Sequence, residues 1–486
     1  MSTEIKNLDP APLWEIFYDL TQIPRPSKRE YKAVIFAKEF GEGLGLKTHV
    51  DKTGNVMIWK PASPGFENRQ GVILQAHLDM VPQKNSETQH DFENDPIDAY
   101  VDGGWVKARG TTLGADNGMG VSAALAVLQD TNLKHGPLEV LLTVDEETGM
   151  TGAFQLETGL LEGRILLNLD SEDEGELYIG CAGGMDTSGK LVYMEEPVSM
   201  NTTAFKLAVT GLKGGHSGLD IHLGRGNANI LICRFVFDMA EKFKMRLAAM
   251  EGGNLRNVIP REAFATITVP SENKEGFLAA VGEYEQLYRA ELGSVEPDLS
   301  FVASEAESPP TIMDKPSQDR LVRLVCGLPN GVIRMDPGLT DIPETSTNLA
   351  IVRAGEGEIQ VGCLLRSSVE SAKLALGSSI QGVLELAGAD VTHSGSYPGW
   401  KPDMESPILA VMKSVYEQEF GKVPAVKVIH AGLECGIIGD AYPGLDTISF
   451  GPTIRFPHSP DEMVHIESVK KFWDFLVRTL EEIPAK

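Results

Sequence analysis

The stretch V-I-L-Q-A-H-L-D-M-V-P, residues 72–82, decides how the rest of the sequence is interpreted. Its apolar start, Val72-Ile73-Leu74, is typical of a buried strand, and parallel α/β sheets bury both faces of such strands. If the backbone stays extended through Asp79, His77 and Asp79 point to the same side, because side chains alternate along a strand. Open α/β sheets bind ligands at the carboxyl ends of their strands. The stretch therefore predicts an imidazole and a carboxylate at a ligand-binding edge.

Two further apolar runs end in acidic residues. Taken alone, a His-x-Asp pair is more typical of a protein surface, so its meaning depends on the other strands. Residues 138–144 are a second buried-strand pattern, and Glu146 and Glu147 follow it. Residues 164–169 are a third, followed by Asp170. Because ligand-type side chains recur after successive strands, we expect them to gather at one edge of the sheet.

Asp116 and His458 extend the set of candidate ligands beyond these strands. Asp116 comes just before a helix of small residues that includes Val121–Leu128, where an aspartate would also serve as a helix cap. His458 lies in a loop after a final apolar strand, residues 445–450. Both residues could therefore return to the edge predicted for His77.

The chain is long enough for two or three domains, because it has 486 residues. From about Gly184 the pattern changes, and residues 205–210 and 264–269 alternate like half-exposed antiparallel strands. We predict an α/β fold in which a mixed central sheet flanked by helices carries an inserted α+β lid domain. The acidic segment 294–317 is predicted to be a linker or surface loop. The predicted boundaries are residues 1–185 and 396–486 for the catalytic domain and 186–395 for the lid.

Composition excludes several classes of protein. The formal net charge of −26, from 43 basic and 69 acidic residues, argues against binding to nucleic acid or anionic membranes. The five cysteines are scattered and form no C-x-x-C pair, which fits a reducing cytoplasm better than a disulfide framework or a thiolate zinc site. Neither a signal peptide nor a membrane-spanning run is evident. We therefore expect a cytoplasmic protein.

The donor atoms of the candidate ligands favour a hydrolytic metal site. Nitrogen and oxygen donors without thiolate suit zinc, manganese or cobalt. Two metal ions with a carboxylate between them would lower the pKa of water toward about 7, and a separate carboxylate would move its proton. Glu146 and Glu147 could divide these tasks if they face opposite ways on extended backbone, although spacing does not say which does which. The candidates are His77, Asp79, Asp116, Glu146, Glu147, Asp170 and His458.

The motifs resemble those of the co-catalytic zinc aminopeptidase/carboxypeptidase/aminoacylase family. The resemblance covers nearly the whole chain and implies a zinc-peptidase-like catalytic domain. Three longer strings, at 72–84, 107–118 and 430–436, are similar to the bacterial branch of the family that hydrolyses Xaa-His dipeptides. The matching motifs are His77-Leu-Asp79, Gly114-Ala-Asp116-Asn-Gly118, Asp145-Glu-Glu147, Asp170, His458 and the lid motif Gly214-Gly-His216-Ser-Gly218.

The resemblance implies a role for each candidate in the catalytic domain. His77 and Asp170 would bind one metal ion, Glu147 and His458 would bind the other, and Asp116 would bridge the two. Asp79 would orient His77, since carboxylates behind metal-bound histidines commonly do so. Glu146 would be the general base and acid. The implied cofactors are two divalent ions, with Zn²⁺ favoured and Co²⁺ or Mn²⁺ as alternatives.

The resemblance also implies that the lid contacts the substrate. His216 would stabilise the oxyanion of the tetrahedral intermediate. Asn257 and Arg366 would hold the substrate carbonyl and carboxylate, although Arg366 could equally form a surface salt bridge. Gly432 would line the pocket. Relatives dimerise through the lid, which implies a homodimer. His216 would act across that interface or, because the lid is large, within its own chain.

The expected activity is metal-dependent hydrolysis of Xaa-His and other unblocked dipeptides by metal-activated water, with Glu146 as the general base. One alternative keeps the metal ions and changes the substrate, giving an N-acyl amino acid deacylase or a tripeptidase. Another is a non-catalytic metal-dependent binding or scaffold protein. The presence of Glu146 disfavours the second alternative, because a binding module needs no base.

Overall fold

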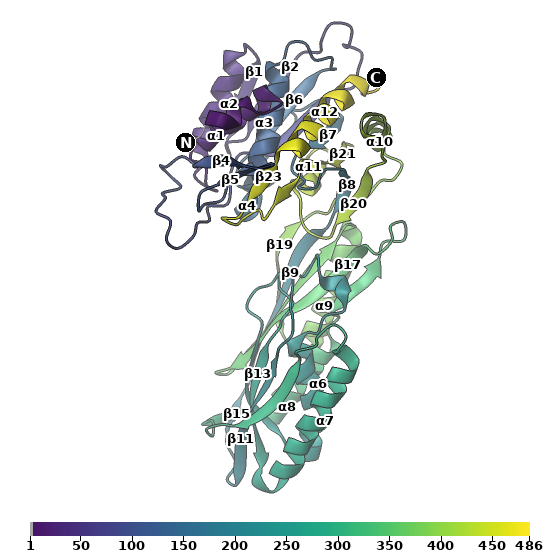
Figure 1. Cartoon of the computed structure of the whole chain (residues 1–486). Helices are drawn as coiled ribbons and strands as arrows, with labels where there is room; N and C mark the ends of the chain where they lie inside the picture. The colour runs from purple at the N-terminus through teal and green to yellow at the C-terminus, as the bar shows by residue number, and fades with distance from the viewer. Residues whose placement is uncertain (1–2) are drawn as a thin grey trace. The chain divides into compact units, whose positions relative to one another are not determined.

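The computed structural model describes residues 3–486, which form two compact units (Figure 1). Unit 1 contains the chain up to Gly180 together with Trp400–Val428 and Leu433–Lys486. Unit 2 contains Cys181–Gly399 and the short segment Ile429–Gly432. The chain therefore leaves unit 1 once for a long excursion and returns to it, as expected for an inserted domain.

Unit 1 is built on a mixed eight-stranded sheet in the order β1-β2-β6-β3-β7-β21-β8-β20. Strand β3 runs parallel to β6 and β7, and β21 runs parallel to β7, whereas β2 runs antiparallel to β6. This confirms the predicted fold class. The bounds are β1 Lys47–Val50, β2 Val56–Lys60, β3 Val72–His77, β6 Leu138–Thr143, β7 Ile165–Asn168, β8 Glu176–Cys181, β20 Ala425–Ile429 and β21 Asp446–Ser449.

Helices flank this sheet, and a smaller sheet adjoins it. Helix α3 is buried along most of its length and packs against α1 and β3. Close packing requires its small residues, since a Cβ at Gly120 would lie 2.5 Å from the Leu169 carbonyl oxygen. The helices are α1 Ala11–Thr21, α2 Tyr31–Gly43, α3 Ala115–Gln129, α4 Glu146–Gly149, α5 Thr151–Phe154, α10 Pro407–Phe420, α11 Glu434–Ala441 and α12 Ile466–Glu482. The smaller sheet contains β4 Ala99–Asp102, β5 Trp105–Ala108, β22 Ile454–Arg455 and β23 Met463–His465.

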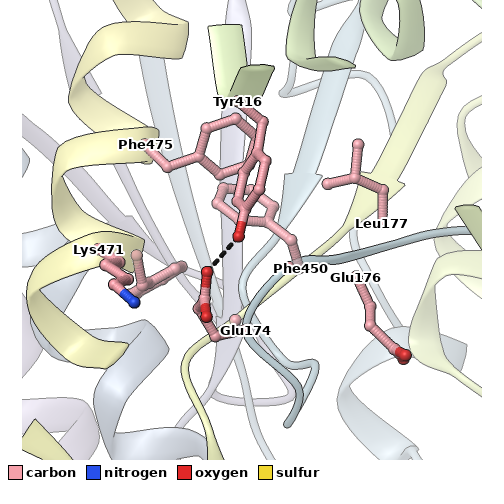
Figure 2. A pocket seen from close by; sticks show the side chains of 10 residues that line it. Glu174, Glu176, Leu177, Tyr416, Phe450, Lys471 and Phe475 are labelled. Carbon is pink, nitrogen blue, oxygen red and sulfur yellow. Dashed lines mark hydrogen bonds between the residues drawn. The ribbon is translucent and has the colours of Figure 1, made fainter. Parts of the chain in front are cut away.

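Aromatic side chains join α10 and α12 to the end of β21. The rings of Tyr416 and Phe475 meet edge to face with centroids 5.1 Å apart, and Phe450 lies 5.2 Å from Phe475. Figure 2 shows the Tyr416 hydroxyl pointing at Glu174, to which it donates a hydrogen bond. The cavity beside this pair has a volume of about 10 Å³, room for one water and too little for a peptide.

Unit 2 contains an antiparallel nine-stranded sheet in the order β14-β11-β13-β12-β17-β18-β9-β19, with β16 paired to β17. Aromatic residues such as Phe205, Phe235 and Phe277 form the core between this sheet and the helices. The strands are β9 Gly183–Val192, β11 Thr202–Thr210, β12 Arg246–Gly252, β13 Ala263–Pro270, β14 Ser300–Glu305, β16 Gly331–Met335, β17 Pro343–Gly355, β18 Glu358–Ser367 and β19 Asp390–Tyr397. The helices are α6 Ala228–Phe243, α7 Lys274–Leu292, α8 Lys315–Gly327 and α9 Glu370–Leu386.

The prediction that residues 294–317 form a linker or surface loop is wrong. Strand β14 in this segment pairs antiparallel with β11, and β15, Thr311–Met313, pairs with β10, Glu195–Pro197. Leu299 and Phe301 are buried and anchor β14 at the edge of the large sheet. The many acidic residues of the segment concealed this short apolar anchor. Within residues 3–486, no helix is long and apolar enough to cross a membrane.

Candidate metal centre

The predicted ligands gather at one edge of the unit 1 sheet. His77 is the last residue of β3, and Asp170 follows β7 by two positions. Glu147 lies in α4, which begins just after β6. Because β3, β6 and β7 are parallel, their carboxyl ends meet at the same edge. The α3 start supplies Asp116, and the loop between β22 and β23 supplies His458.

Asp116 is shared between the two histidines. Its Oδ1 lies 3.2 Å from Nε2 of His77, and its Oδ2 lies 3.2 Å from Nε2 of His458. Asp170 Oδ1 is 3.3 Å from the same His77 nitrogen, and Glu147 Oε2 is 3.0 Å from His458 Nε2. The arrangement is two overlapping groups of three donors, His77–Asp116–Asp170 and Asp116–Glu147–His458, each within 4.8 Å. A third such group contains His77, Glu146 and Glu147.

These residues fit a pair of divalent cations. Glu147 Oε1 is buried without a hydrogen-bond partner, and Asp170 Oδ1 also lacks one despite its proximity to His77. Buried carboxylate oxygens without partners are costly, and a cation would satisfy them. Carboxylate oxygens and imidazole nitrogens, with no thiolate, are the donors that zinc, manganese and cobalt accept in hydrolytic sites.

The crowding of charges shifts the pKa values of the cluster. Hydrogen bonds to Asp116 and Glu147 raise the pKa of His458 to about 11. Burial raises the pKa of Asp170 to about 6, although His77 opposes the shift. Burial also holds the pKa of Glu146 well above its ordinary value. A cluster of this kind binds cations readily, because positive charge relieves the repulsion among its carboxylates.

Asp79 lies behind His77 and also holds the two glutamates. Its Oδ1 is 3.4 Å from His77 Nδ1 and accepts the N–H of Glu146 at 3.0 Å, while Oδ2 accepts the N–H of Glu147 at 3.2 Å. Although burial opposes it, the neighbouring His77 and the N–H of Glu146 lower the pKa of Asp79 to about 2. The expectation of extended backbone at the glutamates is wrong. Asp145, with a φ of 52°, turns the chain, and both residues begin the short helix α4.

Three buried residues near the ligands were not among the predicted site residues. Glu434 is fully buried, and its Oε2 accepts hydrogen bonds from Gln75 Nε2 and Thr143 Oγ1, both at 2.7 Å. Burial raises the pKa of Glu434 to about 7. Arg25 donates to backbone carbonyls, and Glu462 accepts backbone N–H groups around Asp116. The only sign of such a residue in the sequence is a charged side chain next to a recognised motif or between two prolines.

In unit 2, His216 and Arg366 form a cluster of their own. The Nδ1 atom of His216 accepts the N–H groups of Gly218 and Leu219, at 3.2 and 3.1 Å, which leaves the proton of the neutral ring on Nε2. Burial and the nearby Arg366 lower the pKa of His216, which keeps the ring neutral. Arg366 Nη2 lies 3.5 Å from His216 Nε2, and Nη1 donates to the Tyr397 hydroxyl at 3.1 Å. His216 is thus a neutral donor beside a cation.

The other two predicted substrate residues lie near this cluster in different ways. The backbone carbonyl of Asn257 accepts the N–H of Ser217 at 2.8 Å, and the Asn257 side chain is exposed. Gly432 belongs to the segment Ile429–Gly432, which is part of unit 2. That segment approaches Gly218 so closely that a Cβ there would lie 2.0 Å from the His430 carbonyl oxygen. A glycine at 218 is therefore required for the contact.

Comparisons with known proteins agree with this picture. The family model described as Peptidase family M20/M25/M40 matches residues 73–482. The cytosol non-specific dipeptidase of Escherichia coli (strain K12) is 47% identical over 484 residues and is covered completely, as is this chain. The crystal structure of aminoacylhistidine dipeptidase from Vibrio alginolyticus has a TM-score of 0.96 and 49% identity, covering 100% of this chain and 99% of that one. An aminopeptidase from Bacillus cereus shares the fold alone, with a TM-score of 0.57 and 16% identity over 98% of this chain and 99% of that one.

Proposed function

Because the chain belongs to Peptidase family M20/M25/M40, and the two relatives that are 47% and 49% identical over their full length are dipeptidases, we propose how this metallodipeptidase cleaves Xaa-His and other unblocked dipeptides. The observation that carries the proposal is the sharing of Asp116 between His77 and His458, with a further carboxylate beside each histidine. A carboxylate between two groups of donors is what a pair of neighbouring metal ions requires.

The proposed ligands are those grouped by distance. His77 and Asp170 would hold one ion, and Glu147 and His458 the other, with Asp116 bridging. When bound, a pair of divalent ions, in our proposal Zn²⁺, polarises the peptide carbonyl and supplies hydroxide near neutral pH. Asp79 keeps the ring of His77 in its orientation through the 3.4 Å contact at Nδ1.

Glu146 is the proposed general base and acid. Its pKa is raised by burial, which suits a group that takes a proton near neutral pH and then returns it to the leaving amine. The N–H of Glu146 is held by Asp79, so the start of α4 is fixed relative to His77. The base therefore depends on the same carboxylate that orients a ligand.

The roles proposed for residues of unit 2 follow from the hydrogen bonds and charges of their side chains. His216 would donate from Nε2 to the developing oxyanion, because Nδ1 is already an acceptor for two backbone N–H groups. Arg366 would bind the C-terminal carboxylate of the dipeptide in a bidentate pair. Asn257 would bind the substrate carbonyl, and Gly432 would line the pocket with backbone.

A dipeptidase differs from a deacylase or a tripeptidase in the N-terminal group and the chain length of the substrate that it prefers. A dipeptidase prefers a free amine and a short chain, whereas a deacylase prefers an N-acetylated amino acid and a tripeptidase a third residue. Rates for Gly-His, N-acetyl-histidine and Gly-Gly-His would distinguish these activities. Faster turnover of either of the last two would overturn the proposed specificity.

The cytoplasmic location expected from the cysteine pattern agrees with the cytosol in the name of the Escherichia coli relative. We further propose a homodimer, which sedimentation analysis would test.

The decisive experiment removes the metal. Dipeptide hydrolysis should disappear after dialysis against a chelator and return on addition of Zn²⁺, Co²⁺ or Mn²⁺, and metal analysis should find two ions per chain. Full activity after complete removal of metal would refute the proposed mechanism. Comparing the three ions at equal occupancy would test the preference for zinc.

A further inference from the structure

Glu462 makes an unusual set of contacts with the backbone that carries Asp116. Its side chain is buried, with 2% exposure. Oε2 accepts the N–H groups of Leu113 and Gly114 at 2.7 and 2.9 Å, and Oε1 accepts those of Ala115 and Asp116 at 2.8 and 3.1 Å. Four consecutive N–H groups thus point at one carboxylate.

The same turn is held from its carbonyl side by Arg25. This guanidinium is also buried and donates to the carbonyl oxygen of Gly114 and to those of Leu78 and Asp79, the last two at 2.9 Å. Glu462 and Arg25 therefore bind opposite faces of one short segment. Charge-assisted hydrogen bonds of this kind are stronger and shorter than neutral ones.

The segment needs such support because it is not held by a regular helix. Gly114 has a left-handed φ of 71°, and the backbone at Asp116, with ψ at 111°, is non-helical although it lies within the bounds of α3. The first N–H groups of a helix have no intrahelical acceptor, and here those of Leu113–Asp116 are bound by Glu462. The position of the Asp116 side chain therefore depends on partners from outside the helix.

We propose that Glu462 is a positioning residue for the metal centre, because its carboxylate gathers the N–H groups of Leu113–Asp116 and so fixes Asp116 between the two histidines. This inference rests on the proposed function, in which Asp116 bridges the metal ions. Glu462 shares its loop with His458. The loop therefore supplies one ligand directly and aligns another, so that both partners of the 3.2 Å contact between His458 and Asp116 are set by one segment.

The test compares Glu462→Gln with Glu139→Gln. An amide at position 462 would turn an NH₂ group toward two of the four N–H donors, so Asp116 should lose its alignment. Glu139 is a matched control in unit 1, since its buried carboxylate also accepts backbone N–H groups, those of Glu162 and Gly163. It lies at the start of β6, whereas the predicted ligands lie at the edge where β6 ends. Both variants replace a buried carboxylate that accepts backbone N–H groups, four in the case of Glu462 and two in the case of Glu139.

The readouts are zinc affinity, by competition with a chromophoric chelator, and the visible spectrum of the Co²⁺-loaded protein. We expect Glu462→Gln to weaken zinc binding by about 10-fold or more and to change the Co²⁺ spectrum, as loss of residues that orient ligands does. Glu139→Gln should lower the melting temperature and leave zinc affinity and the spectrum as in the wild type. Equal zinc affinity and an unchanged spectrum in Glu462→Gln would overturn the inference.

Two further measurements distinguish failure of the positioning role from misfolding of the variant and from failure of the proposed function. If Glu462→Gln does not fold, Glu462→Asp retains the charge on a shorter stem, and wild-type zinc affinity in that variant would also overturn the inference. The proposed function is tested by the wild type alone. A wild type that binds zinc but hydrolyses no dipeptide would refute the proposed function, while weaker zinc binding by Glu462→Gln would still support the positioning role.

Discussion

The carboxylate of Asp79 accepts the backbone N–H of Glu146, with 3.0 Å between N and Oδ1. The same oxygen lies 3.4 Å from Nδ1 of His77. One side chain therefore sets both the ring that is proposed to bind metal and the start of the helix that carries the proposed base. Disturbing Asp79 should affect metal binding and catalysis together.

Asp79→Asn should weaken zinc binding by about 10- to 100-fold, because the amide no longer stabilises the orientation of His77. It should also lower kcat, since the N–H of Glu146 loses its charged acceptor. Zinc competition and steady-state kinetics with Gly-His would measure both effects. Ser27→Ala is the control, because it removes only the hydroxyl that donates to Asp79 Oδ2 at 2.8 Å. Equal effects of the two substitutions would contradict the prediction.

Glu146→Gln should lower kcat by about 100- to 10,000-fold, the usual contribution of a general acid–base group. Two zinc ions per chain should remain, because Glu146 is not one of the five proposed ligands. Metal analysis of the purified variant, combined with turnover of Gly-His, would test this. Loss of one ion from the variant would instead assign Glu146 to the donor group that it forms with His77 and Glu147.

Arg366→Lys should raise KM for dipeptides much more than it lowers kcat. Lysine keeps the charge but cannot make the bidentate pair with a carboxylate. The wild type should discriminate strongly between Gly-His and its C-terminal amide, and the variant should discriminate less. Tyr397→Phe is the control, since it removes only the hydroxyl that accepts from Arg366 at 3.1 Å. Unchanged discrimination in Arg366→Lys would rule out this carboxylate contact.

His430 should make unit 2 less stable as the pH falls. Burial and the charge of Arg366 lower the pKa of His430 to about 3, whereas an unfolded histidine has a pKa near 6.5. The unfolded chain therefore takes up a proton first, and the stability that the neutral ring contributes above about pH 6.5 is lost progressively toward pH 3, by at most about 1.4 kcal/mol per pH unit.

The measurement compares melting temperatures of wild type and His430→Gln at pH 7 and pH 5. Glutamine can still form a hydrogen bond with Ser346 Oγ, which lies 2.7 Å from Nε2 of the ring, but it does not titrate. From pH 7 to pH 5, the melting temperature of the wild type should fall further than that of the variant. Parallel losses would show that another group determines the acid sensitivity.

The edge of the unit 1 sheet could be predicted because His77, Glu147 and Asp170 each end or closely follow a recognisable strand. Apolar strands before His77 and Asp170 have the composition of buried parallel strands, and such strands must align their carboxyl ends. That His458 joins this edge was predicted from its place in a loop after the last apolar strand and from the family resemblance. The structure brings its ring to Asp116.

What could not be predicted depends on buried polar contacts between distant residues. The sequence around Arg25 and Glu462 is that of ordinary surface loops, and charged residues are seldom fully buried. Only the fold reveals that their partners are backbone groups of Leu78–Asp79 and Leu113–Asp116. The conformation of Glu146 and Glu147 was missed for a similar reason, because the turn at Asp145 is supported by Thr148 and Thr151 hydroxyls that donate to its carboxylate.

Because unit 2 is inserted between Gly180 and Trp400, the proposed ligands of unit 1 are synthesised at widely separated times. The ribosome makes His77, Asp116, Glu147 and Asp170 long before His458, so a growing polypeptide carries an acidic half-site while all of unit 2 is still being translated. Contacts between such distant residues form slowly. In the proposed mechanism, a nascent or prematurely terminated chain that stops within unit 2 would lack His458 and so could not cut peptides, however well its finished parts have folded.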